Sequence, residues 1–345
     1  MYSVVYGGRG VVEVTAARAV PTLQDDRDAV VQVAAAGICG TDLHAYRGEI
    51  PDFAVGTVLG HEFAGTVVTV GAAVPFAAGE RVFASDVIAC GRCRRCAEGR
   101  HYQCPRVSLF GYSTVVGDYT PGGQAEYVRV PFADTVLART PHDVSDEQAL
   151  FVGDVLTTAC AAIDDAGVRP GDVVAVLGAG PLGLLVAACA GLAGARAVVV
   201  ADTDRGRREQ VGARGWTAVA PGALDDAVGG LTEGAGADRV VEAVGSDRAL
   251  ARAVQVAAPH ATVVVVGAHR TVAPSFPSGR AFARELTVRF TVGDPIRLRH
   301  RVMSLIRTGL VDPTTVVTHR LGLGDAAAGY RLMDCREALK VVLRP

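Results

Sequence analysis

The chain has 345 residues, of which 50% are hydrophobic and 20% are charged, so it is long enough for two domains with substantial cores. This composition excludes a disordered or fibrous protein. The formal net charge of −2 provides no excess positive field for phosphate backbones or anionic lipids, which argues against nucleic-acid binding as a main function.

Short strands separated by glycine and proline are predicted for the first 150 residues. The predicted strands are residues 29–35, 64–70, 81–84 and 125–130. Helical patterning is scarce before residue 145, where a serine and two acidic residues suit a helix start. The helical region is expected to continue to about residue 166, with a break at Gly153.

Two polar clusters stand out in this half of the chain. Residues 39–44 are CGTDLH and residues 60–62 are GHE. Cysteine and histidine are good zinc ligands, and a catalytic zinc takes three protein ligands and keeps one open position. A lone histidine is more often a satisfied core or turn residue. The presence of both clusters beside a separate cysteine loop favours metal binding.

Four cysteines lie within fifteen residues, at Cys90, Cys93, Cys96 and Cys104. Four thiolates suit a tetrahedral structural zinc with no open position, and an iron–sulfur cluster is the nearest alternative. The N-terminal residues show no basic leader followed by an apolar stretch, so we expect a cytoplasmic protein. In that reducing environment a tight cysteine cluster is typical of metal binding rather than of disulfides.

Beyond residue 170 the pattern changes to strands that alternate with helices. Apolar strands are predicted at residues 173–177, 197–201, 217–219, 239–243, 262–266 and 286–290, with helices such as 181–193 and 205–213 between them. Near-continuous apolar strands indicate a parallel sheet covered on both faces. Residues 173–195 have the length of a membrane span, but five glycines and Pro181 favour a βαβ unit, so no membrane segment is expected. The last fifty residues predict a helix after Pro295 and strands near 316–319 and 338–343.

A dinucleotide-binding turn follows the first of these strands. It consists of Gly178, Ala179, Gly180, Pro181, Leu182 and Gly183, which matches G-x-G-x-x-G. The first glycine permits the tight turn, the second lets the backbone approach a pyrophosphate, and the third allows the helix to pack on the strand. The unpaired N–H groups of the helix N-terminus would face the phosphates.

Asp202 ends the next predicted strand, 19 residues after Gly183. An acidic residue at this spacing accepts hydrogen bonds from the adenosine ribose and repels a 2′-phosphate, which favours NAD over NADP. Arg205, Arg207 and Arg208 follow closely and provide the argument for NADP.

With these motifs in this order, the whole chain resembles the zinc-dependent medium-chain alcohol dehydrogenases. The resemblance implies Cys39 and His61 as ligands of a catalytic zinc. Residues 152–158, VGDVLTT, resemble the bacterial branch whose third ligand is aspartate, which implies Asp154. It also implies that Asp42 hydrogen-bonds the ring of His61, and that Glu62 lies behind the metal as an alternate or outer carboxylate.

The same resemblance implies hydride transfer between a secondary alcohol or polyol and NAD, with two zinc ions per chain. Thr41 would pass on the proton of the substrate hydroxyl, His44 would hand it to solvent through the cofactor ribose, and Thr158 would contact the nicotinamide. Asp86 matches a substrate-pocket position that is often apolar. A carboxylate there would either select a polyol, sugar or amino alcohol, or cap a turn that faces solvent.

The expected fold is α/β, with a GroES-like catalytic domain at residues 1–153 and 292–345, its zinc lobe at 86–107, and a doubly wound Rossmann domain at 154–291. The family suggests a homodimer or homotetramer, with the edge strand near residues 286–290 as a contact. Two other functions stay open: an NADPH-dependent carbonyl or imine reductase of the same fold, and a catalytically silent relative that binds nucleotide.

Overall fold

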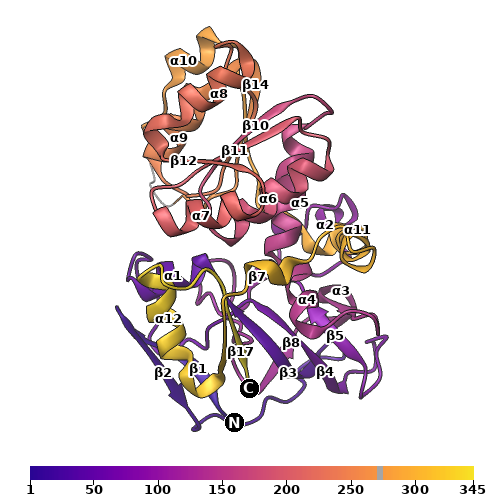
Figure 1. Cartoon of the computed structure of the whole chain (residues 1–345). Helices are drawn as coiled ribbons and strands as arrows, with labels where there is room; N and C mark the ends of the chain where they lie inside the picture. The colour runs from indigo at the N-terminus through magenta and orange to yellow at the C-terminus, as the bar shows by residue number, and fades with distance from the viewer. Residues whose placement is uncertain (270–274) are drawn as a thin grey trace. The chain divides into compact units, whose positions relative to one another are not determined.

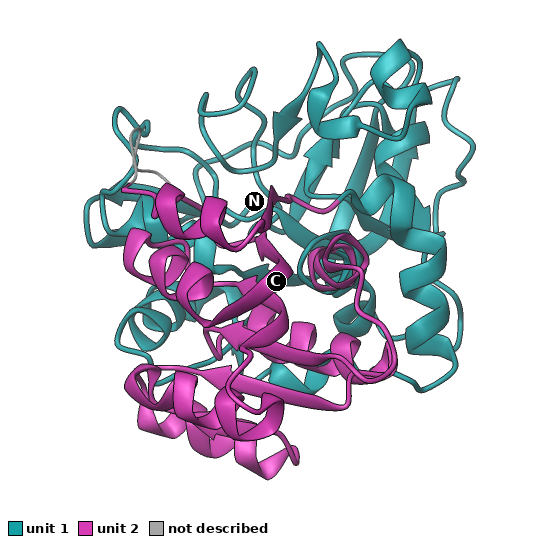
Figure 2. Ribbon diagram, turned by 90° about the horizontal axis from the view of Figure 1, so that it is seen from above, with its two compact units in different colours: residues 1–157, 294–345 teal, residues 158–293 magenta. Residues whose placement is uncertain are grey.

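A computed structural model describes residues 1–269 and 275–345 of the chain. It divides into two compact units, residues 1–157 with 294–345 (unit 1) and residues 158–293 (unit 2), which are coloured separately in Figure 2. The unit boundaries lie a few residues from the expected positions after residues 153 and 291.

Unit 1 is built around a seven-stranded, mostly antiparallel sheet (Figure 1). The strand order is β16 (His319–Gly322), β17 (Val341–Arg344), β3 (Ala29–Ile38), β4 (Glu62–Val70), β5 (Arg81–Ala84) and β9 (Leu137–Arg139), and β8 (Tyr127–Val130) also pairs with β3. Two small antiparallel pairs accompany it, β1 (Ser3–Gly8) with β2 (Val11–Thr15) and β6 (Val87–Ile88) with β7 (Ser108–Leu109). Its core includes Phe63 and Phe110, which pack edge to face with ring centroids 5.0 Å apart.

The register of three strands brings polar residues together at one end of this sheet. Gly37 near the end of β3 pairs with Glu62 at the start of β4, and Ile38 pairs with Val341 at the start of β17. Because both pairings are antiparallel, the end of β3 lies beside the beginnings of β4 and β17. Residues just outside these strands, including Cys39, His61 and Lys340, therefore flank the same end.

Several short helices complete unit 1. They are α1 (Gly40–Tyr46), α2 (Arg94–Ala97), α3 (Ala133–Val136), α4 (Asp146–Leu150), α11 (Pro295–Arg307) and α12 (Ala326–Asp334), and 3₁₀ turns occur at His101–Gln103, Phe151–Gly153, Pro313–Val316 and Leu323–Asp325. The helix α5 (Val155–Ala166) begins in unit 1 and continues into unit 2.

Unit 2 contains a six-stranded parallel sheet. Its order is β12 (Thr217–Val219), β11 (Ala197–Ala201), β10 (Val173–Leu177), β13 (Ala237–Glu242), β14 (Ala257–Val265) and β15 (Thr287–Phe290). The helices are α6 (Pro181–Leu192), α7 (Arg205–Ala213), α8 (Leu224–Thr232), α9 (Asp247–Val256) and α10 (Ser278–Ala283), with a 3₁₀ turn at Pro221–Ala223. From β10 the chain adds strands first on one side of the sheet, with β11 and β12, and then on the other side, with β13, β14 and β15. Because the connections between parallel strands are right-handed, this change of direction places helices on both faces of the sheet. The predicted doubly wound sheet is confirmed.

Some predicted elements differ from the observed ones. The strand expected near residues 316–319 is present but begins three residues later, at His319. Pro313–Val316 form a 3₁₀ turn instead, because Asp312 caps a turn that starts with proline. Strand β14 begins at Ala257, earlier than expected, and α1 lies where helical patterning was not seen. The uncharged stretch 173–195 forms β10, the glycine turn and α6. Among the described helices, none combines the length and apolarity that crossing a membrane requires.

Candidate metal and cofactor sites

The end of the unit 1 sheet gathers four potential metal ligands. Cys39 is the N-cap of α1, His61 precedes β4, and Asp154 lies between the 3₁₀ turn Phe151–Gly153 and α5. One ligand atom from each of Cys39, His61, Glu62 and Asp154 lies within 4.8 Å of the others. Asp154 Oδ2 lies 3.7 Å from Cys39 Sγ and 3.3 Å from His61 Nε2. Residues separated by more than a hundred positions thus converge on one point.

Asp42 supports this cluster from behind. Its Oδ2 accepts a 2.8 Å hydrogen bond from the backbone N–H of Cys39, and its Oδ1 lies 3.4 Å from His61 Nδ1. This electrostatic contact is longer than an ordinary hydrogen bond. A carboxylate beside Nδ1 favours the tautomer that carries its proton there, which leaves the Nε2 lone pair directed at the cluster. Burial lowers the pKa of His61, but Asp42 and Asp154 together hold it well above its ordinary value.

Glu62 is held by Lys340, which immediately precedes β17. The Lys340 ammonium donates to Glu62 Oε2, and both side chains are at most 1% exposed. Burial raises the pKa of the Glu62 carboxyl, and Lys340 opposes this shift. Glu62 Oε1 is buried and has no hydrogen-bond partner among the described residues. An unsatisfied carboxylate oxygen beside a thiol, an imidazole and a second carboxylate fits a divalent zinc ion.

The two residues expected to move a proton lie on α1. Thr41 Oγ1 is 3.1 Å from His61 Nε2, so its hydroxyl belongs to the cluster. His44 lies one turn further along the helix, where its Nδ1 is 2.9 Å from Glu49 Oε2 and its side chain is 17% exposed. The helix therefore carries one polar group inside the cluster and one at the solvent boundary.

Asp86 is buried and does not face solvent, so its predicted role as a solvent-facing turn cap is wrong. Its Oδ1 accepts a 2.7 Å hydrogen bond from the N–H of Val87, and its Oδ2 accepts one from the Tyr102 hydroxyl. Burial, followed by the charge of Asp154, raises the pKa of Asp86 to about 8.

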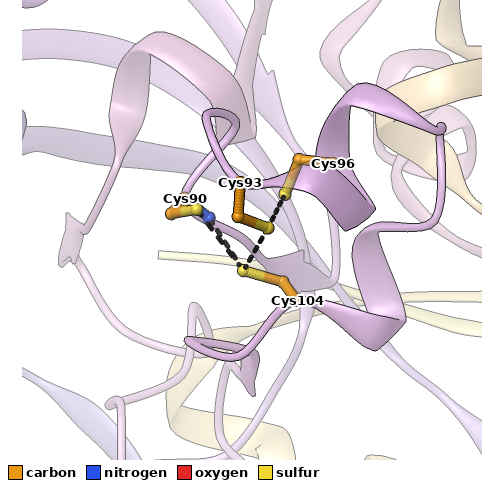
Figure 3. Close-up of side chains that lie close together, drawn as sticks. All are labelled: Cys90, Cys93, Cys96 and Cys104. Carbon is orange, nitrogen blue, oxygen red and sulfur yellow. Dashed lines mark hydrogen bonds between the residues drawn. The ribbon is translucent and has the colours of Figure 1, made fainter.

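The four-cysteine cluster is shown in Figure 3. Cys93 Sγ lies 3.5 Å from Cys96 Sγ and 3.9 Å from Cys104 Sγ, and Cys104 Sγ lies 3.5 Å from Cys90 Sγ. A tetrahedral zinc with bonds of about 2.3 Å separates its sulfur ligands by roughly 3.8 Å, so this spacing suits zinc. Burial raises the pKa of Cys90, but backbone N–H groups of Arg92 and Cys93 outweigh burial and bring it to about 7.

The glycine turn of unit 2 follows β10 and leads into α6. Gly178 has φ +101°, which favours glycine, and a Cβ on Gly183 would lie 1.9 Å from the Gly178 carbonyl oxygen. Gly180 is the N-cap of α6, and among the described residues beyond its chain neighbours only Arg207 Nη1, at 3.9 Å, comes within 4 Å of the position of a Cβ on Gly180. Pro181 and Leu182 form the first turn of the helix. The open space at Gly180 is where a pyrophosphate would approach the helix N-terminus.

Asp202 borders this turn. Its Oδ2 accepts a 2.7 Å hydrogen bond from the N–H of Ala179, and its Oδ1 accepts one from Asp204 at 2.8 Å. A carboxylate has about four lone-pair positions, so two remain for other donors. Thr158 lies on α5 in the same unit, directly beside Gly293. Asp154 lies just before the first residue of α5, and Thr158 lies in the first turn of that helix.

Lys340 and Tyr102 were not predicted as site residues. Lys340 is the only lysine of the chain, and this could have drawn attention to it. Because the chain uses arginine almost everywhere else, however, the rarity of lysine did not point to a functional site. Tyr102 lies between two of the clustered cysteines, and sequence spacing gave no indication that its hydroxyl reaches Asp86.

A thiol–imidazole–carboxylate cluster, a four-cysteine cluster and a dinucleotide-binding turn on a doubly wound sheet define a zinc- and nicotinamide-dependent oxidoreductase. Comparison with known families agrees: residues 25–141 match the alcohol dehydrogenase GroES-like domain and residues 181–307 match the zinc-binding dehydrogenase domain. The chain belongs to the zinc-dependent medium-chain alcohol dehydrogenase family, so the predicted family and its GroES-like and Rossmann domains are confirmed.

Individual relatives are similar over nearly the whole chain. A probable zinc-binding alcohol dehydrogenase of Mycobacterium tuberculosis is 35% identical over 348 residues, covering 100% of this chain and 89% of the relative. L-galactonate-5-dehydrogenase of Escherichia coli is 32% identical over 324 residues, with 92% of each chain covered. The solved structure of an alcohol dehydrogenase from Thermus sp. ATN1 matches with a TM-score of 0.94 and 36% identity, covering 100% of this chain and 99% of that one.

Proposed function

We propose that this oxidoreductase transfers a hydride between a secondary alcohol or polyol-like substrate and NAD. The observation that carries the proposal is the convergence of Cys39, His61 and Asp154 within 4.8 Å, with the Thr41 hydroxyl 3.1 Å from His61 Nε2. This arrangement offers three metal ligands and an adjacent group that can handle a proton. The similarity to L-galactonate-5-dehydrogenase supports a polyhydroxylated substrate.

Cys39, His61 and Asp154 would hold one zinc, and Cys90, Cys93, Cys96 and Cys104 would hold a second, giving two ions per chain. When bound at the first site, zinc supplies Lewis-acid chemistry that lowers the pKa of a hydroxyl group. Glu62 stays behind this site because Lys340 holds one of its oxygens. The four-cysteine site has no open position, so its metal would be structural.

The residues of α1 would carry the proton of the substrate hydroxyl. Thr41 is placed to accept this proton, because its Oγ1 lies 3.1 Å from Nε2 of His61, the atom that would bind the metal. His44 is placed to deliver a proton to solvent by way of the cofactor ribose, because its ring is partly exposed and paired with Glu49. Asp42 would keep the His61 ring in the orientation and tautomer that the metal requires.

Thr158 would contact the nicotinamide and Asp202 the adenosine ribose. All three nearby arginines have partners: Arg205 Nε lies 2.8 Å from Glu209 Oε1, and Arg208 donates to the backbone carbonyls of Asp202 and Thr203. Arg207 Nη1 lies 4.0 Å from Asp202 Oδ2. A 2′-phosphate that approached the Arg207 guanidinium would therefore also be repelled by the Asp202 carboxylate. This arrangement favours NAD.

Asp202→Ala is therefore expected to reduce the ratio of kcat/KM for NAD over NADP by about tenfold or more, because it removes the ribose acceptor and the repulsion of the 2′-phosphate. Steady-state kinetics with both cofactors measure the ratio. Asp226→Ala, an exposed position on α8, is the matched control. A ratio that is unchanged in Asp202→Ala would mean that another residue selects the cofactor.

The proposed activity is tested with the purified protein, a panel of secondary alcohols, polyols and ketones, and both nicotinamides. We expect NAD-dependent oxidation and two zinc ions per chain by elemental analysis. Nucleotide binding without turnover, in protein that contains both metals, would instead support a catalytically silent relative. Turnover restricted to carbonyl or imine reduction with NADPH would support a reductase.

The cytoplasmic location and the homo-oligomeric state stay predictions. Strand β15 forms one edge of the unit 2 sheet, and the nearby Phe282 and Phe290 are 87% and 62% exposed. We propose this edge as the contact of a homodimer or homotetramer. A species with the mass of one chain in sedimentation velocity would contradict an oligomer.

A further inference from the structure

A buried glutamine connects the segments that carry Cys39 and His61. Gln124 lies three residues before β8 and is 0% exposed. Its Nε2 donates to the carbonyl of Gly37 at 3.0 Å and to Asp42 Oδ2 at 3.3 Å. The proposed mechanism gives this glutamine no task, although it touches both the end of β3 and the carboxylate behind the metal-ligand cluster.

Gln124 also packs against the residue that precedes His61. Gly60 has φ +93°, and a Cβ on Gly60 would lie 2.4 Å from Gln124 Cγ. The backbone N–H of Gln124 donates to the carbonyl of Leu59 at 3.0 Å, and the N–H of Gly123 donates to the carbonyl of Gly60 at 2.8 Å. Gln124 is therefore fixed against the turn that presents the imidazole.

Tyr330 on α12 determines which way the Gln124 amide points. Its hydroxyl donates to Gln124 Oε1 at 2.9 Å, and its side chain is fully buried. Burial raises the pKa of Tyr330 well above its ordinary value and the charge of Asp42 adds to this shift, so the phenol keeps the proton that it donates. Because Oε1 faces this donor, Nε2 faces the Gly37 carbonyl and the Asp42 carboxylate, which both accept. The reverse orientation would place the amide oxygen against two acceptors.

The amide in turn sets the rotation of the Asp42 carboxylate. Asp42 Oδ2 accepts from Gln124 Nε2 and from the backbone N–H of Cys39. Its Oδ1 is buried, has no hydrogen-bond partner among the described residues and lies 3.4 Å from His61 Nδ1. Two donors on one oxygen thus direct the other oxygen at the imidazole. A chain of polar contacts runs from Tyr330 through Gln124 and Asp42 to His61.

We propose that Gln124 and Tyr330 are positioning residues that fix Asp42 behind the His61 ring and thereby set the affinity of this site for zinc. The inference rests on the proposed function, because it concerns the metal that this function requires. Removing an outer hydrogen-bond partner of a metal-binding imidazole lowers metal affinity by about 10–100-fold. Tyr330 acts through two further side chains, so we expect the lower end of this range for its hydroxyl.

The test is a competition titration of the zinc-loaded protein with a chromophoric zinc chelator, which measures zinc affinity without requiring turnover. Tyr330→Phe removes only the hydroxyl and should lower the affinity of the site that contains Cys39 by about tenfold. Cys39→Ala, which keeps the four-cysteine site, identifies the release step of that second site. Tyr6→Phe alters another buried tyrosine of the same hydrophobic core and should behave as the parent.

A double-mutant cycle separates positioning from a general structural role. Gln124→Leu should lower the same affinity by about tenfold or more, and Tyr330→Phe should cause no further loss in the Gln124→Leu background, because it acts through the glutamine. Urea unfolding of each variant reports its overall stability. Additive losses of affinity, or a loss of stability with parental zinc affinity, would overturn the inference alone. A parent that binds zinc only at the four-cysteine site would overturn the proposed function as well.

Discussion

Cys39→Ala is expected to lower kcat/KM by about a thousandfold and to leave one zinc per chain instead of two. The Cys39 thiol lies 3.7 Å from Asp154 Oδ2 and supplies the only sulfur among the four potential ligands of its cluster in the described structure. Lewis-acid stabilisation provides several kcal/mol, and each 1.36 kcal/mol is tenfold in rate, so losing the metal has an effect of this size.

Kinetics and elemental analysis of the same preparations measure both effects. Cys335→Ala is the matched control, because Cys335 is exposed and lies in neither cluster. It should keep full activity and both metals. Cys39→Ala protein that retains two zinc ions and parental turnover would show that this cluster is not the catalytic metal site.

Lys340→Met is expected to destabilise the protein by about 3–5 kcal/mol, which is the usual cost of removing one partner of a buried ion pair. Lys340 is 1% exposed and its partner Glu62 is 0% exposed, so water cannot take the place of the lost ammonium. The methionine side chain fills a similar volume but leaves the Glu62 carboxyl without its donor.

Urea unfolding of the purified protein, followed by circular dichroism, measures this change in the free energy of unfolding. The single tryptophan, Trp216, lies in unit 2 and is less suited to report on unit 1. Adding Glu62→Gln should recover part of the loss, because it removes the uncompensated charge. Arg94→Met, which breaks a solvent-exposed pair with Glu98, should have no measurable effect. A Lys340→Met protein as stable as the parent would contradict the importance of the pair.

The cofactor-binding unit was highly predictable from the sequence. Strands of a parallel sheet are buried on both faces, so β10 and β11 appear as uninterrupted apolar runs whose predicted bounds match the observed ones. The beginning of β14 was missed because Pro259 and the positive φ of His260 interrupt the regular pattern, and its pairing with β13 shifts register there.

The metal-ligand cluster was less predictable. Cys39, His61 and Asp154 were proposed because of a resemblance between motifs, and the sequence alone contains no information on how far apart they lie. Helix α1 has only seven residues and begins after a cysteine N-cap, which is not among the preferred capping residues. The contact between Lys340 and Glu62 depends on strand pairing over 278 positions, which local patterns do not encode.

The burial of the only lysine has a practical consequence for chemical labelling. Acylating reagents that target ε-amino groups have a single possible site in this chain, and that site is 1% exposed and paired. Modification at Lys340 therefore requires the start of β17 to separate from the sheet. The acylation rate of Lys340 would report how often that end of the sheet opens. Ligands that stabilise the closed sheet would lower this rate.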